Sequence, residues 1–237
     1  MGVNIFYCPT AVLNEDCELD ENESGHITRV LRKKENEELY VFDGKGKLFD
    51  ARIVSIGKKQ VLVHIARLVE KDESNKPALH IAIAPPKNIE RFEWFAEKVT
   101  EIGVTEITPL LCTHSERKEL RTDRIEKVLL SACKQSLKLT LPKLNEVMKF
   151  SDFVASVDGN TRKYIAYCDE NPIHLKDAYH GGFDAVVMIG PEGDFTKEEV
   201  LQAGKNGFET VSLGKSRLRL ETAGIYVATL FDIVNSK

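Results

Sequence analysis

The sequence predicts a mixed α/β protein in which a small β-rich domain precedes a larger domain of alternating strands and helices. Two observations lead to this fold class. Short β-branched runs joined by Asp-Gly and Gly-Lys turns fill residues 1 to about 70, a pattern typical of β-hairpins. From about residue 79 onward, apolar strand-like runs alternate with segments whose apolar residues recur at helical spacing. A chain of 237 residues is long enough for two domains, each with its own core.

The N-terminal region contains three strand-like runs, at residues 39–42, 48–56 and 61–65. The turn Asp43-Gly44-Lys45-Gly46 separates the first two runs, and Gly57-Lys58-Lys59 separates the second from the third. Such turns predict hairpins, so we expect a small β domain in the form of a barrel. The polar segment 70–77 is typical of a linker, which places the two domains at residues 1–72 and 76–237.

The C-terminal region begins with an apolar strand at residues 80–84, ended by Pro85-Pro86. Apolar residues then recur at helical spacing from Ile89 to Ile102, with Asn88 suited to the N-cap and Gly103 to the stop. The other predicted strands are residues 106–112, 164–168, 185–189 and 210–213, and the other predicted helices are residues 121–138, 197–206 and 221–235. This alternation implies a mostly parallel sheet covered by helices on both faces.

Composition limits the class of protein. Hydrophobic residues make up 42% and charged residues 30%, the profile of an ordinary soluble globular protein. No apolar run approaches the roughly 20 residues of a membrane-spanning helix, and the N-terminus lacks the segments of a signal peptide. The five cysteines include no Cys-x-x-Cys pair, and the six histidines include no i,i+4 pair. We therefore expect a cytoplasmic protein with reduced thiols, no membrane partner and no metal site.

Charge is unevenly distributed along the chain. The net charge is −4, yet residues 114–143 carry eight Lys and Arg side chains against four acids, whereas residues 1–25 carry six acids and neither Lys nor Arg. The basic segment is either the solvated face of a helix or a surface that contacts phosphates. Charge alone favours the solvated face.

Two glycine-containing loops connect predicted strands to predicted helices. Residues 190–195 (Gly-Pro-Glu-Gly-Asp-Phe) follow one strand, and Thr196 is suited to cap the next helix. Ligands bind at the carboxyl ends of parallel strands, where such loops lie, although an ordinary turn has the same appearance. The second loop, within residues 213–222, contains Gly-Lys-Ser, but a P-loop would need glycine at Glu209. Nucleotide hydrolysis therefore lacks support, and without a Gly-x-Ser-x-Gly elbow so does acyl transfer.

A series of short motifs covers nearly the whole chain. The C-terminal motifs are Ile189-Gly190-Pro191-Glu192-Gly193, Leu213-Gly214, Leu218-Arg219-x-Glu221-Thr222-Ala223, Lys98-x-x-Glu101-x-Gly103-Val104, Ser115-Glu116-Arg117 and Gln135-Ser136 with Pro142; the N-terminal ones are His26 with Val30-Leu31-Arg32, and Asp43-Gly44-x-Gly46. In this order they resemble the RsmE-type 16S rRNA (uracil-N3)-methyltransferases of the SPOUT superfamily. One departure is Lys215-Ser216, where the family often has proline and arginine, and Arg217 is a candidate replacement for the displaced charge.

The resemblance implies a small N-terminal PUA-like β-barrel that binds RNA and a C-terminal SPOUT α/β domain with a deep trefoil knot, which binds the cofactor and forms a homodimer. It implies S-adenosyl-L-methionine-dependent methylation of uridine N3 in 16S rRNA of the small ribosomal subunit. Two alternatives stay open. One is a SPOUT methyltransferase that acts on another RNA or another atom, such as a ribose hydroxyl, and the other is a catalytically silent PUA-like RNA-binding protein.

The resemblance also implies which residues bind the cofactor and the RNA. The expected cofactor-binding residues lie mainly in the two glycine loops: Leu111, Ile189, Gly190, Pro191, Glu192, Gly193, Leu213, Gly214, Leu218, Thr222 and Ala223. The expected RNA-binding residues are basic: Arg29, Arg32, Lys33, Lys34, Arg117, Lys118, Arg121 and Arg124. With the resemblance added, a phosphate-binding surface becomes the favoured interpretation of these side chains.

The chemistry of methylation at N3 suggests three catalytic candidates. Uridine N3 is a poor nucleophile while protonated, and loss of its proton spreads negative charge onto O2 and O4, which a fixed cation would stabilise. Arg219 is the first candidate for that cation and Arg217 the second, although a salt bridge to Glu221 or a phosphate contact is almost equally expected of Arg219. Glu221 is the third candidate, with holding the loop or capping the helix as its expected role. Because N3 lies on the Watson–Crick edge, the target base must be unpaired or flipped out.

Overall fold

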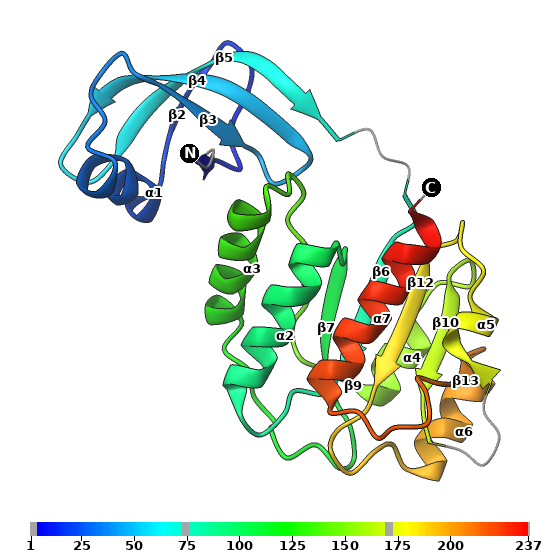
Figure 1. Ribbon diagram of the computed structural model, residues 1–237. Helices are drawn as coiled ribbons and strands as arrows, with labels where there is room; N and C mark the ends of the chain where they lie inside the picture. Colours follow the sequence, from blue (N-terminus) through cyan, green and yellow to red (C-terminus); the bar gives the residue numbers. More distant parts are fainter. Residues whose placement is uncertain (1–3, 73–75, 169–172, 237) are drawn as a thin grey trace. The chain divides into compact units, whose positions relative to one another are not determined.

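The computed structural model describes residues 4–72, 76–168 and 173–236. Two compact units are present: one contains Met1–Ser74 and Cys133–Leu141, and the other contains Asn75–Ala132 and Pro142–Lys237. Each unit has its own sheet (Figure 1), which confirms the predicted mixed α/β class. Residues 73–75 of the predicted linker lie outside the described residues.

The N-terminal unit is built on a five-stranded sheet with the order β1-β3-β4-β5-β2. The bounds are β1 Ile5–Tyr7, β2 Asp16–Glu18, β3 Glu38–Phe42, β4 Lys47–Ile56 and β5 Val61–Lys71. β1 pairs in parallel with β3, and the other pairs are antiparallel. Both predicted hairpins are present, and Asp43 Oδ1 fixes the first turn by accepting hydrogen bonds from the backbone N–H groups of Lys45 and Lys47. The expected linker begins too early, because Glu70 and Lys71 still pair with β4.

Short elements complete this unit. Helix α1 (Glu21–Gly25) runs into a π-helix over His26–Val30, and Asp20 caps α1 by accepting from Glu23 N. The core beneath the sheet contains Phe6, Ile27 and Ile53, each at most 1% exposed. The two edge strands approach each other where the Cys8 thiol donates to Cys17 Sγ at 2.8 Å.

Residues 133–141 belong to the N-terminal unit, although they come long after its first segment in the sequence. The predicted domain bounds of 1–72 and 76–237 place them in the C-terminal domain. Gly46 N donates to Leu139 O at 3.1 Å, and Leu141 N donates to Gly44 O at 2.9 Å. The ammonium of Lys134 pairs with the buried Glu23 carboxylate at 2.7 Å. These contacts join segments far apart in the sequence, so no local pattern marks them.

The C-terminal unit contains an eight-stranded sheet with the order β11-β13-β10-β12-β6-β7-β8, in which β9 also pairs with β7. The strands are β6 Leu79–Ile83, β7 Glu106–Leu111, β8 Lys143–Leu144, β9 Met148–Lys149, β10 Arg162–Ala166, β11 Ile173–His174, β12 Ala185–Ile189 and β13 Glu209–Ser212. Every pair in the described part of this sheet is parallel. The predicted parallel sheet is therefore confirmed.

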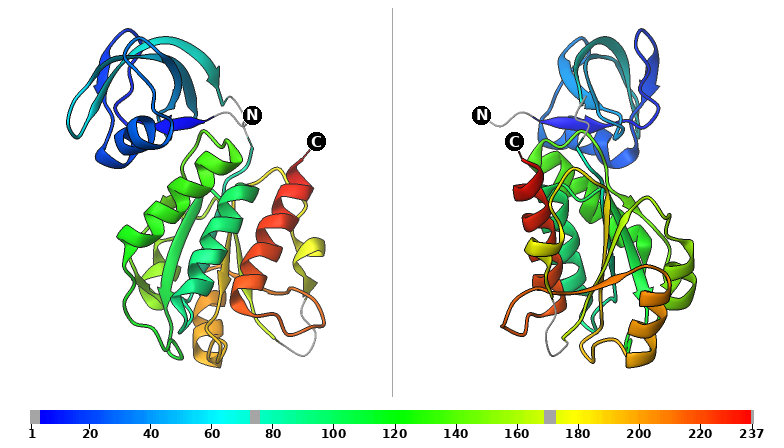
Figure 2. Two further views of the ribbon diagram at one scale, coloured as in Figure 1. Left: turned by 60° about the vertical axis from the view of Figure 1, so that its left-hand side comes forward. Right: turned by 90° about the vertical axis from the view of Figure 1, so that its right-hand side faces the viewer.

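Helices cover both faces of this sheet (Figure 2), as expected. The helices are α2 Ile89–Ile102, α3 Thr122–Ser136, α4 Phe150–Ser156, α5 Leu175–Ala178, α6 Lys197–Lys205 and α7 Leu220–Asn235. The last four residues of α3, 133–136, belong to the N-terminal unit. α2 and α7 pack together on one face, and α4 and α6 pack together on the other. In the described part of the chain, no helix is long and apolar enough to cross a membrane.

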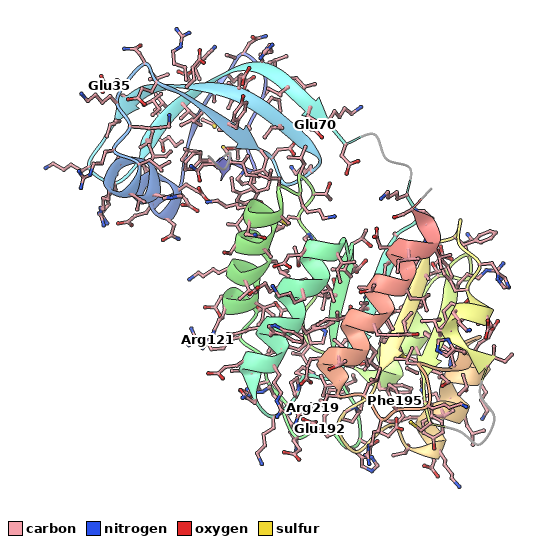
Figure 3. All side chains as sticks on the ribbon, viewed as in Figure 1. Glu35, Glu70, Arg121, Glu192, Phe195 and Arg219 are labelled. Carbon is pink, nitrogen blue, oxygen red and sulfur yellow. The ribbon has the colours of Figure 1, made fainter. Side chains whose placement is uncertain are left out.

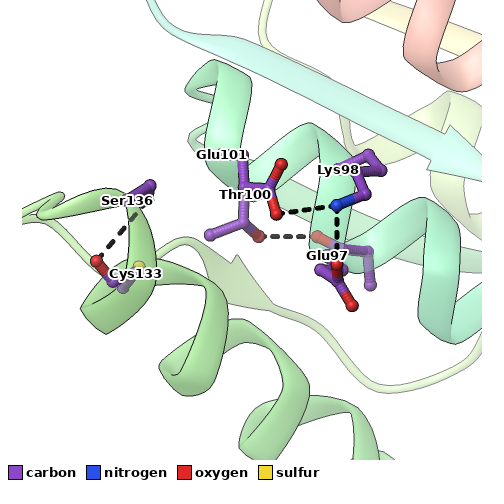
Figure 4. Close-up of polar contacts among 7 residues, drawn as sticks. Glu97, Lys98, Thr100, Glu101, Cys133 and Ser136 are labelled. Carbon is purple, nitrogen blue, oxygen red and sulfur yellow. Dashed lines mark hydrogen bonds and ion pairs between the residues drawn. The ribbon is translucent and has the colours of Figure 1, made fainter.

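Local signals explain where α2 begins and ends. Asn88 accepts from Glu90 N at the start, and Gly103 closes the other end by donating from its backbone N–H to Val99 O. Along the helix, Lys98 Nζ donates to the carboxylates of Glu97 and Glu101 (Figure 4). Another face of the helix buries aromatic and aliphatic side chains, and α2 packs against α7.

Close approach of α2 and α7 depends on one glycine. A Cβ built on Gly224 of α7 would lie 2.2 Å from Cε2 of the fully buried Phe95 on α2. The hydrogen of glycine leaves room for the ring, so the two helices pack at short range. This contact fixes α2 beside the N-terminal half of α7.

Candidate active site

A cavity of about 410 Å³ lies at the carboxyl ends of β10, β12 and β13. Its wall includes Ala166, Ile189 and Ser212, which are the last residues of these three strands. The carboxyl ends of parallel strands meet at one edge of a sheet, where ligands bind in such folds. The two glycine loops identified in the sequence both contribute to the wall.

The first loop, residues 190–195, has a fixed backbone. Asp194 adopts a left-handed conformation with φ of 61°, and its Oδ1 accepts from Phe195 N. The imidazole of His114 contacts the carbonyls of Gly193 and Asp194 at 3.1 and 3.0 Å, so its Nδ1 must donate. A Cβ on Gly190 would lie 3.1 Å from the Phe195 ring, so a larger residue at 190 would crowd the loop.

The helix that follows the first loop begins as predicted. Thr196 accepts from Glu199 N, and the Glu199 carboxylate accepts from Thr196 N, which forms a capping box. A second oxygen of the same carboxylate accepts from Thr113 N at 2.8 Å. Burial raises the pKa of the nearby Cys112 thiol to about 12, which leaves this cysteine a packing residue and not a nucleophile.

The second loop, residues 213–219, crosses from β13 to α7. Gly214 has φ of 125°, a conformation that residues with a Cβ rarely adopt, and its N–H donates to Ser212 Oγ at 3.0 Å. Arg217 links the two loops, because its Nη2 lies 3.4 Å from the carbonyl oxygen of Glu192. Both loops therefore face one cavity.

Arg219 stands at the N-cap of α7 and lines the cavity. Figure 3 shows it beside Glu192 at the same end of the C-terminal unit. Its guanidinium makes no hydrogen bond or ion pair with any residue that the structure describes. Of the two alternatives to a catalytic role for Arg219, a salt bridge to Glu221 is not present among the described residues, and a phosphate contact stays a prediction.

Glu221 lies in the first turn of α7 and is only 6% exposed. Its Oε1 is 3.9 Å from Nε of Arg91, a residue of α2 that also lines the cavity. Its Oε2 is buried and has no hydrogen-bond partner among the described residues. Arg219, and not Glu221, is the N-cap residue of α7, and Glu221 pairs with Arg91 on α2, a helix that sequence reasoning did not connect to it. The catalytic and loop-holding roles of Glu221 stay predictions.

The cavity collects most of the residues expected to bind the cofactor. Those in its wall are Ile189, Gly190, Pro191, Glu192, Leu213, Gly214, Leu218 and Ala223. Three expected residues, Leu111, Gly193 and Thr222, are not in the wall. Gly193 packs against the His114 side chain, and Thr222 is exposed. The wall also contains residues that the sequence did not single out, among them Arg91, Tyr167, Cys168 and Asp194.

The basic residues expected to bind RNA lie in several environments. Arg117 donates to the carbonyls of Pro86 and Lys87 and therefore holds the loop before α2. Arg121 pairs with Asp123, and Arg124 pairs with Glu93 on α2. Lys118 is exposed and has no partner among the described residues.

In the N-terminal unit, Arg29, Arg32 and Lys34 are exposed, whereas Lys33 donates to Glu38 O. Among the residues described in either unit, no group of three or more His, Cys, Asp and Glu side chains could hold a metal ion.

Comparison with known proteins places this geometry in a family. Residues 72–232 match the family model of an RNA methyltransferase domain, and residues 19–66 match that of an RNA methyltransferase PUA domain. Ribosomal RNA small subunit methyltransferase E of Mesomycoplasma hyopneumoniae is 31% identical over 86% of this chain and 88% of its own length. The Rickettsia conorii protein of the same name is 30% identical over 90% of this chain and 87% of its own length.

Solved structures agree with the sequence comparisons. A probable rRNA-methyltransferase from Porphyromonas gingivalis superposes with a TM-score of 0.91 at 37% identity and covers 99% of both chains. Ribosomal RNA small subunit methyltransferase E from Neisseria gonorrhoeae, solved bound to S-adenosyl methionine, gives a TM-score of 0.84 at 28% identity, over 96% of this chain and 95% of its own. The chain described here therefore belongs to the ribosomal RNA small subunit methyltransferase E family, with an RNA methyltransferase domain preceded by an RNA methyltransferase PUA domain.

Proposed function

We propose that this protein transfers a methyl group from S-adenosyl-L-methionine to N3 of a uridine in 16S rRNA of the small ribosomal subunit. The observation that carries the proposal is the cavity formed by the two glycine loops at the carboxyl edge of the parallel sheet. Support comes from the names of the relatives, which act on small-subunit ribosomal RNA, and from the Neisseria gonorrhoeae relative bound to S-adenosyl methionine.

The cavity fits the proposed cofactor in size and in chemistry. About 410 Å³ is within the range of small-molecule sites. Gly190 lines the cavity, and a Cβ there would lie 3.1 Å from the Phe195 ring, so the shape of this loop depends on glycine at residue 190. The buried Glu221 Oε2 lacks a partner in the described protein and would accept a hydrogen bond from a ligand. When bound, S-adenosylmethionine supplies an electrophilic methyl group on a sulfonium.

The residues of this chain would contribute orientation and charge. The loops at 190–195 and 213–219 would hold the cofactor against the strand ends, which converts an encounter of two reactants into a positioned one. The Arg219 guanidinium, unpaired in the described protein and in the cavity wall, would stabilise the negative charge that develops on the uracil oxygens as N3 loses its proton. Arg217 is already directed to Glu192 O and is the weaker candidate.

RNA binding would depend on basic side chains of both units. Exposed Arg29, Arg32 and Lys34 in the N-terminal unit and Lys118, Arg121 and Arg124 in the C-terminal unit would contact phosphates. Arg117 would contribute little to phosphate binding, because its guanidinium already donates hydrogen bonds to the backbone carbonyls of Pro86 and Lys87. The deep trefoil knot, the homodimer and the cytoplasmic location remain part of the proposal.

Nucleoside mass spectrometry of 16S rRNA tests this function in cells. A deletion strain is compared with the same strain carrying the wild-type gene or a Gly214→Val variant. Valine at φ of 125° is strained, so we expect the variant to fold but to lose cofactor binding. The proposal predicts that 3-methyluridine disappears in the deletion strain and returns only with the wild-type gene. Loss of a ribose methyl group, or no change at all, would contradict it.

A further inference from the structure

The Arg91–Glu221 pair combines opposite charges in one wall of the cavity. Glu221 belongs to the first turn of α7 and Arg91 to the first turn of α2. The packing of Gly224 against Phe95 sets the distance between these two helices. Core packing therefore sets the positions from which the two side chains extend, and the Arg91 side chain itself is 41% exposed.

The pair is incomplete in the protein itself. The separation of 3.9 Å between Arg91 Nε and Glu221 Oε1 exceeds hydrogen-bond length. Oε2 of Glu221 has no partner, and the Arg91 guanidinium makes no hydrogen bond to any described residue. A buried carboxylate oxygen without a donor is costly, whereas a bound ligand could supply the missing donor.

Two chemical groups would satisfy this arrangement at once. An ammonium provides three N–H donors for the carboxylate, and a carboxylate provides acceptors for the planar guanidinium. The α-amino acid end of S-adenosylmethionine carries both groups on one carbon. Other parts of that molecule do not: the ribose and adenine are uncharged, and the sulfonium has no hydrogen to donate.

We propose that Arg91 and Glu221 form the receptor for the zwitterionic amino-acid end of the cofactor, with Glu221 accepting from the ammonium and Arg91 donating to the carboxylate. This inference rests on the proposed function, because it assigns part of the cofactor to part of that cavity. It leaves Arg219 and Arg217, on the second loop, for the nucleotide substrate. Arg91 and Glu221 are therefore cofactor-binding residues that determine ligand specificity.

Two related ligands isolate the amino-acid end. S-adenosylhomocysteine and 5′-methylthioadenosine share the adenine, the ribose and a neutral thioether sulfur, but only the first carries the zwitterion. Isothermal titration calorimetry with wild type should show tighter binding of S-adenosylhomocysteine. Glu221→Gln keeps the shape of the side chain and removes its charge, so it should weaken S-adenosylhomocysteine about tenfold or more, the usual size of a charge-assisted hydrogen bond. Its affinity for 5′-methylthioadenosine should stay within about twofold of wild type.

Arg91→Gln should show the same selective loss, and Glu90→Gln provides the matched control. Glu90 lies on the same helix as Arg91, is exposed and is outside the cavity wall, so its variant should bind both ligands as wild type does. Unchanged binding of 5′-methylthioadenosine also shows that each variant remains folded.

Several results would overturn the inference. Equal weakening of both ligands by Glu221→Gln would place its partner on the nucleoside, and no weakening of either would remove Glu221 from the binding site. A larger loss for S-adenosylmethionine than for S-adenosylhomocysteine would place the partner at the sulfonium. If wild type binds none of the three ligands, the proposed function itself fails.

Discussion

The contact between Gly224 and Phe95 predicts a large effect from adding a single methyl group. A Cβ at residue 224 would lie 2.2 Å from Cε2 and 2.6 Å from Cδ2 of the ring, whereas carbon atoms in contact are about 3.5–4.0 Å apart. The overlap is therefore at least roughly 1 Å. Phe95 is fully buried and packs against Phe92, with ring centroids 5.6 Å apart. The ring cannot turn away without disturbing another core residue.

The size of the effect follows from two opposing contributions. Overpacking of a buried site costs about 1–3 kcal/mol, and an overlap of this size belongs at the upper end. The better helix propensity of alanine offsets about 1 kcal/mol of that cost. We expect Gly224→Ala to lower the free energy of unfolding of the C-terminal unit by about 2 kcal/mol and its Tm by about 4–8 °C.

Gly204→Ala is the matched control for this prediction. Gly204 also lies inside a helix, α6, but a Cβ there would meet nothing within 4 Å. The same substitution should therefore raise the free energy of unfolding, by about 0.4–1 kcal/mol. Differential scanning calorimetry of the two variants beside wild type measures both shifts. Equal shifts in the two variants, or a Gly224→Ala protein as stable as wild type, would refute the close packing of α2 and α7.

Three further predictions concern the site and its surroundings. Arg219→Ala should lower the single-turnover methylation rate about 10²–10³-fold and leave the cofactor and RNA affinities nearly unchanged. Arg219→Lys should recover only part of the lost rate. A full rate in the alanine variant would remove the catalytic role. Replacing Arg121 and Arg124 with Ala should flatten the plot of log RNA affinity against log salt by about one to two units, and an unaltered slope would show that these side chains do not contact phosphates. Burial lowers the pKa of His80, so on acidification the unfolded chain binds a proton at this residue before the folded protein does. The free energy of unfolding should therefore fall as pH drops below about 6.5. Chemical denaturation at a series of pH values measures this fall, which should be smaller in His80→Gln.

Elements with strong local signals could be predicted from the sequence. The α6 helix begins where Thr196 and Glu199 form a reciprocal cap, and β12 coincides with the predicted strand at residues 185–189. The α3 helix ends at Ser136, two residues earlier than expected, because Leu137 takes a left-handed φ of 56°. Nothing in the sequence marks that reversal, since leucine is a good helix former.

Elements that depend on distant partners could not be predicted. β8, β9 and β11 have two residues each, too few for any periodicity, and exist because neighbouring strands supply their hydrogen bonds. The return of residues 133–141 to the N-terminal unit depends on backbone bonds to the turn at Gly44 and Gly46. Such pairings are properties of the folded chain.

The candidate site divides in the same way. Both loops could be located, because glycines after predicted strands indicate the edge where ligands bind. Arg91 was missed, since its proximity to Glu221 arises from the packing of α2 on α7. A usable signal was present: Arg91 lies in the first turn of the helix that follows the strand ended by Pro85-Pro86, at the same carboxyl edge of the sheet.

The most direct test of the central claim is methyl transfer by the purified protein. Small ribosomal subunits from the deletion strain are incubated with the protein and S-adenosylmethionine carrying a deuterated methyl group, and the 16S rRNA is digested to nucleosides for mass spectrometry. The proposed function predicts one labelled product, 3-methyluridine, formed by wild type and at a rate about 10²–10³-fold lower by Arg219→Ala. A label on another base or on a ribose, or no transfer by a protein that binds the cofactor, would contradict it.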